Sequence, residues 1–220
     1  MESSATGSHI PVDSDTLDAN ASDTMKIPST IILAAGHGGS DTGAVSPDGR
    51  HNERDQAVTI VNHAAEVLAM DYSIDAVIAP HDQDTHETIA WLNARYPWGS
   101  AWAFEIHRDW VASIKEPAAS LRCGVYHGSS DWSVMLAVRL VSEFKANGAD
   151  PSSWTRDQRE SRFSRLGWIA QPKCLSHLVE LGLVQGRNDG DHLRRLAGIF
   201  ADSLAAVIAG TESSEPSHTP

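Results

Sequence analysis

Short apolar runs alternate along this chain with longer segments in which apolar residues recur every three or four positions. The runs predict strands over residues 29–35, 74–79, 101–107, 122–127 and 175–183. The helical spacing predicts helices over residues 52–70, 85–95, 131–146 and 191–208, the third with Asp131 as its N-cap and Gly148 just past its end. Because strands that alternate with helices form a mostly parallel sheet covered on both faces, the predicted fold class is α/β.

The two ends of the chain differ in composition from its middle. Residues 1–27 are rich in Ser, Asp, Thr and Ala and contain few apolar residues, which predicts a flexible acidic arm. Residues 211–220 have the same character and predict a flexible tail, so a single folded domain spans residues 28–210. The arm is a candidate docking segment for a partner that delivers the protein, and a plain disordered tail is the alternative.

Charge and cysteine content exclude several classes of function. The formal net charge of −12 argues against nucleic acid as a partner, because phosphate binding needs a basic face. Four arginines recur every three residues from position 156 to 165, which predicts a solvated helix face. No apolar stretch approaches the length of a membrane span, and the N-terminus lacks the pattern of an ordinary secretory signal. Cys123 and Cys174 are expected to be reduced and structural, although their pairing stays open.

A histidine surrounded by glycines follows the first predicted strand. His37 lies between Gly36 and the pair Gly38 and Gly39, at a point where a buried strand gives way to a loop. Ligands of open α/β proteins bind at such strand ends, and bare backbone on both sides lets a metal or a substrate approach closely. A plain turn residue is the alternative interpretation of His37.

Three further residues join His37 once the elements are placed. Glu53 opens the helix that follows, His107 ends the third strand, and Glu180 lies near the end of the last strand. In a parallel sheet these positions gather along one edge. Two imidazoles and a carboxylate are a familiar donor set for catalytic zinc, and another carboxylate near the metal-bound water can serve as general base.

Each of these residues also has a structural interpretation. Glu53 could simply favour the positive end of its helix, and His107 could be a satisfied core or loop histidine. Glu180 stands in an apolar strand, where an acid must find a partner or shift its pKa, and a buried salt bridge to an arginine is its alternative role.

Four segments together resemble the zinc-dependent N-acetylmuramoyl-L-alanine amidases of the amidase type 3 family. Residues 36–44 match the family's Gly-His-Gly-Gly-x-Asp-x-Gly-Ala segment, and residues 49–53 match its Gly-x-x-x-Glu. Residues 105–109 are similar to the strand ending in Ser-x-His-x-Asn, and residues 180–183 to Glu-Leu-Gly-Phe. The resemblance covers residues 29–208 and implies a mixed sheet of about six strands flanked by helices.

The resemblance also implies roles for particular residues. His37, Glu53 and His107 correspond to the ligands of one Zn²⁺ per chain, and Glu180 to the catalytic acid and base. The implied substrate is peptidoglycan, cleaved at the amide bond between N-acetylmuramic acid and the L-alanine of the stem peptide. Candidate substrate-binding residues are His127, Asp109 and Arg108.

Some positions depart from the family pattern without removing a ligand. Glu105 and Asp109 stand where Ser and Asn are usual, which makes the site more acidic. Ala34 and Ala35 replace a frequent Asp-Pro, and Gly186 occupies a usual Asn position. These departures bear on specificity more than on chemistry.

Two other functions stay open at this point. One is a zinc peptidase or another amide hydrolase of related fold, and the other is a non-catalytic module that binds the cell wall. A hydrolase without an ordinary export signal or a wall-binding repeat suits an endolysin or the payload of a phage-like particle. Such a protein is made in the cytoplasm and released or delivered to the bacterial cell wall.

Overall fold

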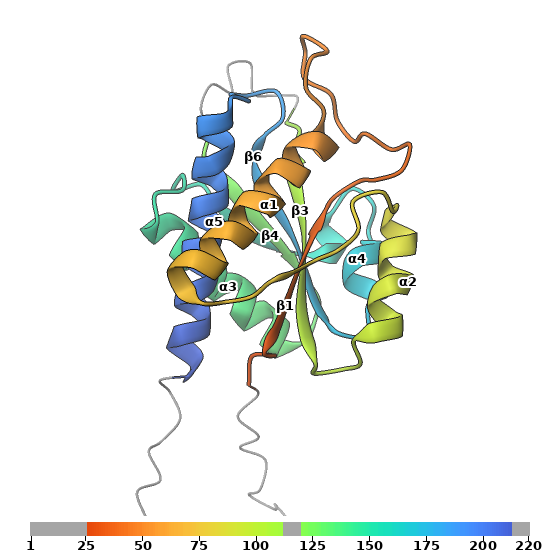
Figure 1. Cartoon of the computed structure of the whole chain (residues 1–220), viewed down its shortest axis with the longest axis vertical. Helices are drawn as coiled ribbons and strands as arrows, with labels where there is room; N and C mark the ends of the chain where they lie inside the picture. Colours follow the sequence, from red (N-terminus) through yellow and green to blue (C-terminus); the bar gives the residue numbers. More distant parts are fainter. Residues whose placement is uncertain (1–25, 112–119, 213–220) are drawn as a thin grey trace, which may run out of the picture.

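A six-stranded sheet forms the centre of the protein. The computed structural model describes residues 26–111 and 120–212. The strands are β1 (Thr30–Ala35), β2 (Val77–Ile78), β3 (Ala101–Asp109), β4 (Cys123–His127), β5 (Trp154–Asp157) and β6 (Leu175–Leu183). Their order across the sheet is β2-β1-β3-β6-β4-β5. Figure 1 shows β1, β3, β4 and β6 crossing the middle of the molecule. β2, β1, β3 and β6 run parallel, whereas β4 is antiparallel to β6 and parallel to β5. The predicted mixed, mostly parallel sheet is confirmed.

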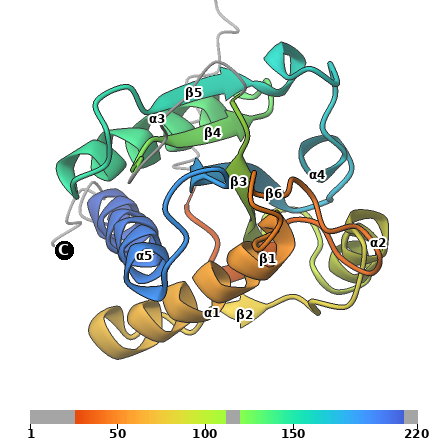
Figure 2. The same ribbon diagram turned by 90° about the horizontal axis from the view of Figure 1, so that it is seen from above.

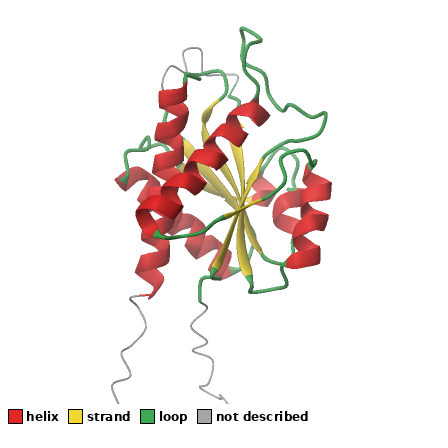
Figure 3. Ribbon diagram, viewed as in Figure 1, coloured by secondary structure: helices red, strands yellow, loops and turns green. Residues whose placement is uncertain are grey.

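Helices cover both faces of the sheet, as predicted. They are α1 (Glu53–Tyr72), α2 (Thr85–Arg95), α3 (Asp131–Ala146), α4 (Gly167–Ala170) and α5 (Gly190–Glu212), with a short 3-10 helix η1 (Gln158–Glu160). Seen from above, α1, α3 and α5 lie on one side of the strands, and α2 and α4 on the other (Figure 2). The strands form a middle layer between these two groups of helices (Figure 3).

The two faces of the sheet bury two separate apolar cores. Along β1, Ile31 and Leu33 belong to the larger core with α1, α3 and α5, whereas Ile32 and Ala34 belong to the smaller core with α2 and α4. A strand that is buried on both faces reads as a continuous apolar run, which is why β1 was recognisable from sequence. This packing fixes the end of β1, from which the loop that contains His37 departs.

Two predicted details are wrong, and two elements were not predicted. β5 and α4 were missed because β5 is a four-residue edge strand that carries charged residues and α4 has a single turn. The arginines between 156 and 165 fall on β5, η1 and loops, so they do not form a helix face. The N-cap of α3 is Ser130 and not Asp131, since the Ser130 side chain accepts a hydrogen bond from the Ser133 N–H.

The two cysteines and the two ends of the chain were also subjects of prediction. Cys123 and Cys174 are free and buried, and burial raises the pKa of their thiols to about 12 and about 11.

The predicted arm and tail lie almost wholly outside the described residues, and α5 runs on to Glu212. In the described part of the chain, none of the helices has the length and apolar character to cross a membrane.

Candidate metal centre

The loop after β1 brings His37 over the end of β3. The Gly36 N–H donates to the Ile106 carbonyl oxygen at 2.7 Å, and His37 then adopts a positive φ of 64°. A Cβ on Gly36 would lie 2.4 Å from the His107 ring, and one on Gly43 would lie 2.5 Å from Cδ2 of His37. Both imidazoles therefore rest against bare backbone, which explains the glycines around the motif.

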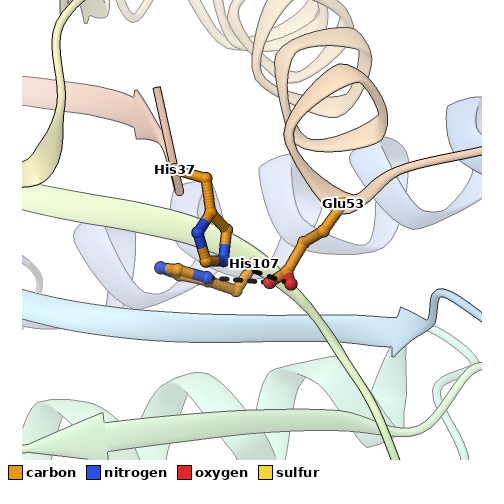
Figure 4. Close-up of side chains that lie close together, drawn as sticks. All are labelled: His37, Glu53 and His107. Atoms are coloured by element: carbon orange, nitrogen blue, oxygen red, sulfur yellow. Dashed lines mark hydrogen bonds and ion pairs between the residues drawn. The ribbon is translucent and has the colours of Figure 1, made fainter. Parts of the chain in front are cut away.

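Glu53 joins the two histidines from the first turn of α1. Its carboxylate is buried, with Oε2 at 3.1 Å from Nε2 of His37 and Oε1 at 2.9 Å from Nδ1 of His107 (Figure 4). The backbone N–H groups of Ala44 and Arg108 also donate to this carboxylate, at 3.0 and 3.2 Å. Glu53 is therefore held at the centre of a cluster, and the interpretation that it only favours the helix end is insufficient.

The electrostatics of this cluster favour an ionised carboxylate. Burial raises the pKa of Glu53, but hydrogen bonds from His107 and His37 outweigh it and hold that pKa well below its ordinary value. Burial likewise opposes the charged form of His107, yet Glu105 and Glu53 raise its pKa well above the ordinary value. The pKa of His37 is also raised, because Glu53 and Asp41 outweigh its burial. The carboxylates therefore favour the protonated form of both imidazoles in the metal-free chain.

Each imidazole has a second carboxylate on its far nitrogen. Asp41 lies 2.8 Å from Nδ1 of His37, and Glu105 lies 2.9 Å from Nε2 of His107. The contact with Glu105 was not predicted from sequence. A signal was present, because residues two apart on a strand point to the same face and Glu105 precedes His107 by two.

Glu180 lies beside the cluster on the neighbouring strand. It is the register partner of His107 across the parallel β3–β6 pair. Burial raises the pKa of Glu180 to about 8, and the charges of Glu53 and Asp109 add to this effect while His107 opposes it. Its Oε2 atom is buried without a hydrogen-bond partner, and Glu180 forms no salt bridge with any described residue. The alternative of a structural salt bridge is therefore wrong.

The donor set fits a zinc ion. One ligand atom each from His37, Glu53 and His107 lies within 4.8 Å of the others. Two imidazole nitrogens and an ionised carboxylate are ligands that zinc takes in catalytic sites, where a fourth position stays open. The second carboxylate on each imidazole is also typical of zinc sites, because it orients the ring.

The three predicted substrate-binding residues have different locations. Asp109 follows His107 at the end of β3, partly exposed, and burial raises its pKa. Gly124 on β4 pairs with Glu180 on β6. Because the two strands are antiparallel, His127, three residues after Gly124, lies toward the N-terminal end of β6. The role of His127 in substrate binding stays a prediction.

Arg108 is the most deeply buried of the three candidates. The residue is only 1% exposed, and its guanidinium donates to the backbone carbonyl of Leu183, the last residue of β6. Its backbone N–H donates to Glu53, so Arg108 also supports the centre through its main chain. The role of its side chain in substrate binding stays a prediction.

A comparison with protein families gives a match over most of the chain. A family profile described as N-acetylmuramoyl-L-alanine amidase matches residues 31–209. This range contains the candidate ligands His37, Glu53 and His107, and also Glu180. No curated protein sequence matches the chain.

Solved structures share the fold at low sequence identity. N-acetylmuramoyl-L-alanine amidase AmiC2 of Nostoc punctiforme is 21% identical with a TM-score of 0.60, over 85% of this chain and 99% of that one. The catalytic domain of CwlV from Bacillus (Paenibacillus) polymyxa var. colistinus is 19% identical with a TM-score of 0.62, over 82% and 98%. The CwlD amidase of Clostridioides difficile, solved in complex with the GerS lipoprotein, is 16% identical with a TM-score of 0.63, over 82% and 98%.

Proposed function

Because the chain belongs to the N-acetylmuramoyl-L-alanine amidase family, we propose that it hydrolyses peptidoglycan with zinc bound by His37, Glu53 and His107 and with Glu180 as general base. The bond cleaved joins the lactyl group of N-acetylmuramic acid to the L-alanine of the stem peptide. The observation that carries the proposal is the convergence of the three ligands beside Glu180, whose Oε2 atom is buried without a hydrogen-bond partner among the described residues.

The residues divide the work between binding and proton transfer. Zinc, when bound, supplies a Lewis acid that lowers the pKa of a water molecule and polarises the amide carbonyl. Glu180 takes a proton from the attacking water while the oxygen of that water bonds to the carbonyl carbon. As the carbon–nitrogen bond breaks, Glu180 returns that proton to the departing amine. The products are a lactyl carboxylate and a free L-alanine amino terminus.

The surroundings of Glu180 suit this role. Its unpartnered Oε2 is free to accept a proton, and its pKa of about 8 without metal shows how little its surroundings favour the charged form. A divalent cation nearby favours the ionised form, so metal binding prepares Glu180 as a base. Its pairing in register with His107 keeps it beside the ligands.

Digestion of purified peptidoglycan with the zinc-loaded full chain tests the proposal. We expect new L-alanine amino termini without new reducing sugars, and loss of this release in Glu180→Gln. Glu66→Gln, on the exposed surface of α1, is the matched control and should digest normally. New amino termini within the stem peptide would instead indicate a peptidase, and no release at all would indicate a non-catalytic wall-binding module.

Action at the bacterial cell wall implies a route to it. A chain with a net charge of −12 is repelled by an anionic envelope, which favours release or delivery over unaided adhesion. We infer an endolysin-like or injected protein that uses residues 1–27 to dock a delivery partner. Deletion of residues 1–27 should abolish delivery to the wall and leave digestion of purified peptidoglycan unchanged; normal delivery without them would refute the docking role.

A further inference from the structure

Glu105 is a buried carboxylate in contact with the candidate metal centre but outside its ligand set. The residue is 3% exposed and lies on β3 two positions before His107, so both side chains point to the same face of the sheet. Its Oε2 lies 2.9 Å from Nε2 of His107, and Thr85 at the start of α2 donates its hydroxyl to Oε1 at 3.3 Å. A carboxylate this buried is costly unless it is hydrogen-bonded, and the ring of His107 is its partner together with the Thr85 hydroxyl.

The contact fixes which nitrogen of His107 faces the metal. Nδ1 of the ring is directed at Glu53, at 2.9 Å, and Nε2 at Glu105. When Nε2–H donates to Glu105, the lone pair of the neutral imidazole is on Nδ1, on the side of the other ligands. Without Glu105 the ring would lose its only hydrogen-bond partner at Nε2 among the described residues and could rotate or exchange its proton.

The equivalent carboxylate on His37 is much weaker. Asp41 contacts Nδ1 of His37 at 2.8 Å, but its side chain is 66% exposed, whereas that of Glu105 is 4% exposed. Water screens an exposed contact far more than a buried one. The centre therefore depends on Glu105 more than on Asp41 for the orientation of an imidazole.

We propose that Glu105 is a positioning residue that sets the orientation and tautomer of His107 and raises the affinity of the centre for zinc. This inference rests on the proposed function, because it concerns the same metal centre. Loss of such an outer carboxylate lowers metal affinity by about 10- to 100-fold.

The test is the zinc affinity of the full chain, measured by competition with a chromophoric chelator at constant pH. We expect Glu105→Ala to bind zinc about 10- to 100-fold more weakly than wild type. Glu105→Gln keeps the shape and an oxygen acceptor, so it should recover part of the loss, and Glu105→Ser should fall between Gln and Ala. Glu66→Ala, on the exposed surface of α1, is the control and should bind zinc as wild type does.

A second readout reports on the ring itself. In the zinc-loaded protein, ¹⁵N NMR of the histidine rings should show His107 protonated at Nε2 in wild type, with that signal lost or broadened by exchange in Glu105→Ala. Thr85→Val removes only the hydroxyl that holds Glu105 and should produce a smaller change in the same direction. If Glu105→Ala does not fold, Glu105→Gln and Thr85→Val carry the test.

Wild-type affinity and an unchanged His107 signal in a folded Glu105→Ala would overturn the positioning role. If the wild-type chain binds zinc and digests peptidoglycan in that case, the proposed function stands and only this inference fails. Failure of the wild-type chain to bind zinc would overturn both.

Discussion

Glu180 on β6 is paired in register with His107 on β3, so a carboxylate with one oxygen unpartnered among the described residues lies directly beside a candidate zinc ligand. Side chains paired this way on parallel strands share one face of the sheet. The backbone of the sheet, and not a mobile loop, therefore sets the spacing between the base and the metal centre. His37, in contrast, is placed by a loop that depends on glycine.

Replacing Glu180 by Gln should separate catalysis from metal binding. The change removes the proton acceptor and leaves all three ligands, so we expect activity to fall by about 10²- to 10⁴-fold while one zinc per chain is retained. Metal analysis beside a peptidoglycan digestion assay checks both expectations. Activity within a few fold of wild type would exclude Glu180 as the base.

Zinc affinity should rise with pH. The pKa values of His37 and His107 are raised in the metal-free chain, and both imidazoles must lose a proton before they bind metal. Because both pKa values are raised, the dissociation constant for zinc should decrease as pH increases through the range above the ordinary histidine pKa of about 6.5. Chelator competition at fixed ionic strength measures this, and an affinity independent of pH would contradict the ligand assignment.

The Gly36→Ala substitution should disrupt the metal centre by steric contact alone. A Cβ at this position would lie 2.4 Å from the His107 ring, so the ring or the loop must shift. We expect zinc affinity to fall by about 10-fold or more, which is at least the effect of removing a carboxylate that contacts a metal ligand. Zinc titration of the folded variant gives the answer.

Gly198→Ala is the matched control for that substitution. Gly198 lies within α5, and a Cβ there meets nothing within 4 Å. We expect unchanged zinc affinity and a stability gain of about 0.5–1 kcal/mol from the better helix former. Equal zinc affinity in the two variants would show that the space around His107 is not essential.

The metal-free protein should lose stability as pH rises from about 5 to about 8, in part through Glu180. The pKa of Glu180 is 4.5 as its ordinary value and about 8 in the folded chain. The folded state therefore binds this proton more tightly than the unfolded state does. The resulting stabilisation is fully present below the pKa of Glu180 in the unfolded state, and it is lost as pH rises through the pKa of Glu180 in the folded state. The Tm of wild type minus that of Glu180→Gln should become more negative over this interval. A constant difference would show that the Glu180 pKa is ordinary.

Sequence predicted most of the elements and the convergence of His37, Glu53 and His107, because their signals are local. Strands buried on both faces appear as apolar runs, and the glycines around His37 mark the loop that carries it. Membership of the amidase family confirms the function that the motifs implied.

The parts that sequence missed depend on contacts between distant segments. β5 is a short edge strand with charged residues, and it has no pattern of its own. The hydroxyl of Thr85 reaches Glu105 from a different element, so spacing along the chain could not reveal it. The burial of Arg108 is likewise set by the carbonyl of Leu183, at the end of another strand.

Anomalous scattering at the zinc absorption edge, from crystals of the zinc-loaded chain, tests the central claim most directly. The account predicts one peak per chain, bonded to Nε2 of His37, Nδ1 of His107 and the carboxylate of Glu53. A peak elsewhere, or a zinc-loaded active chain without one at these three residues, would contradict it.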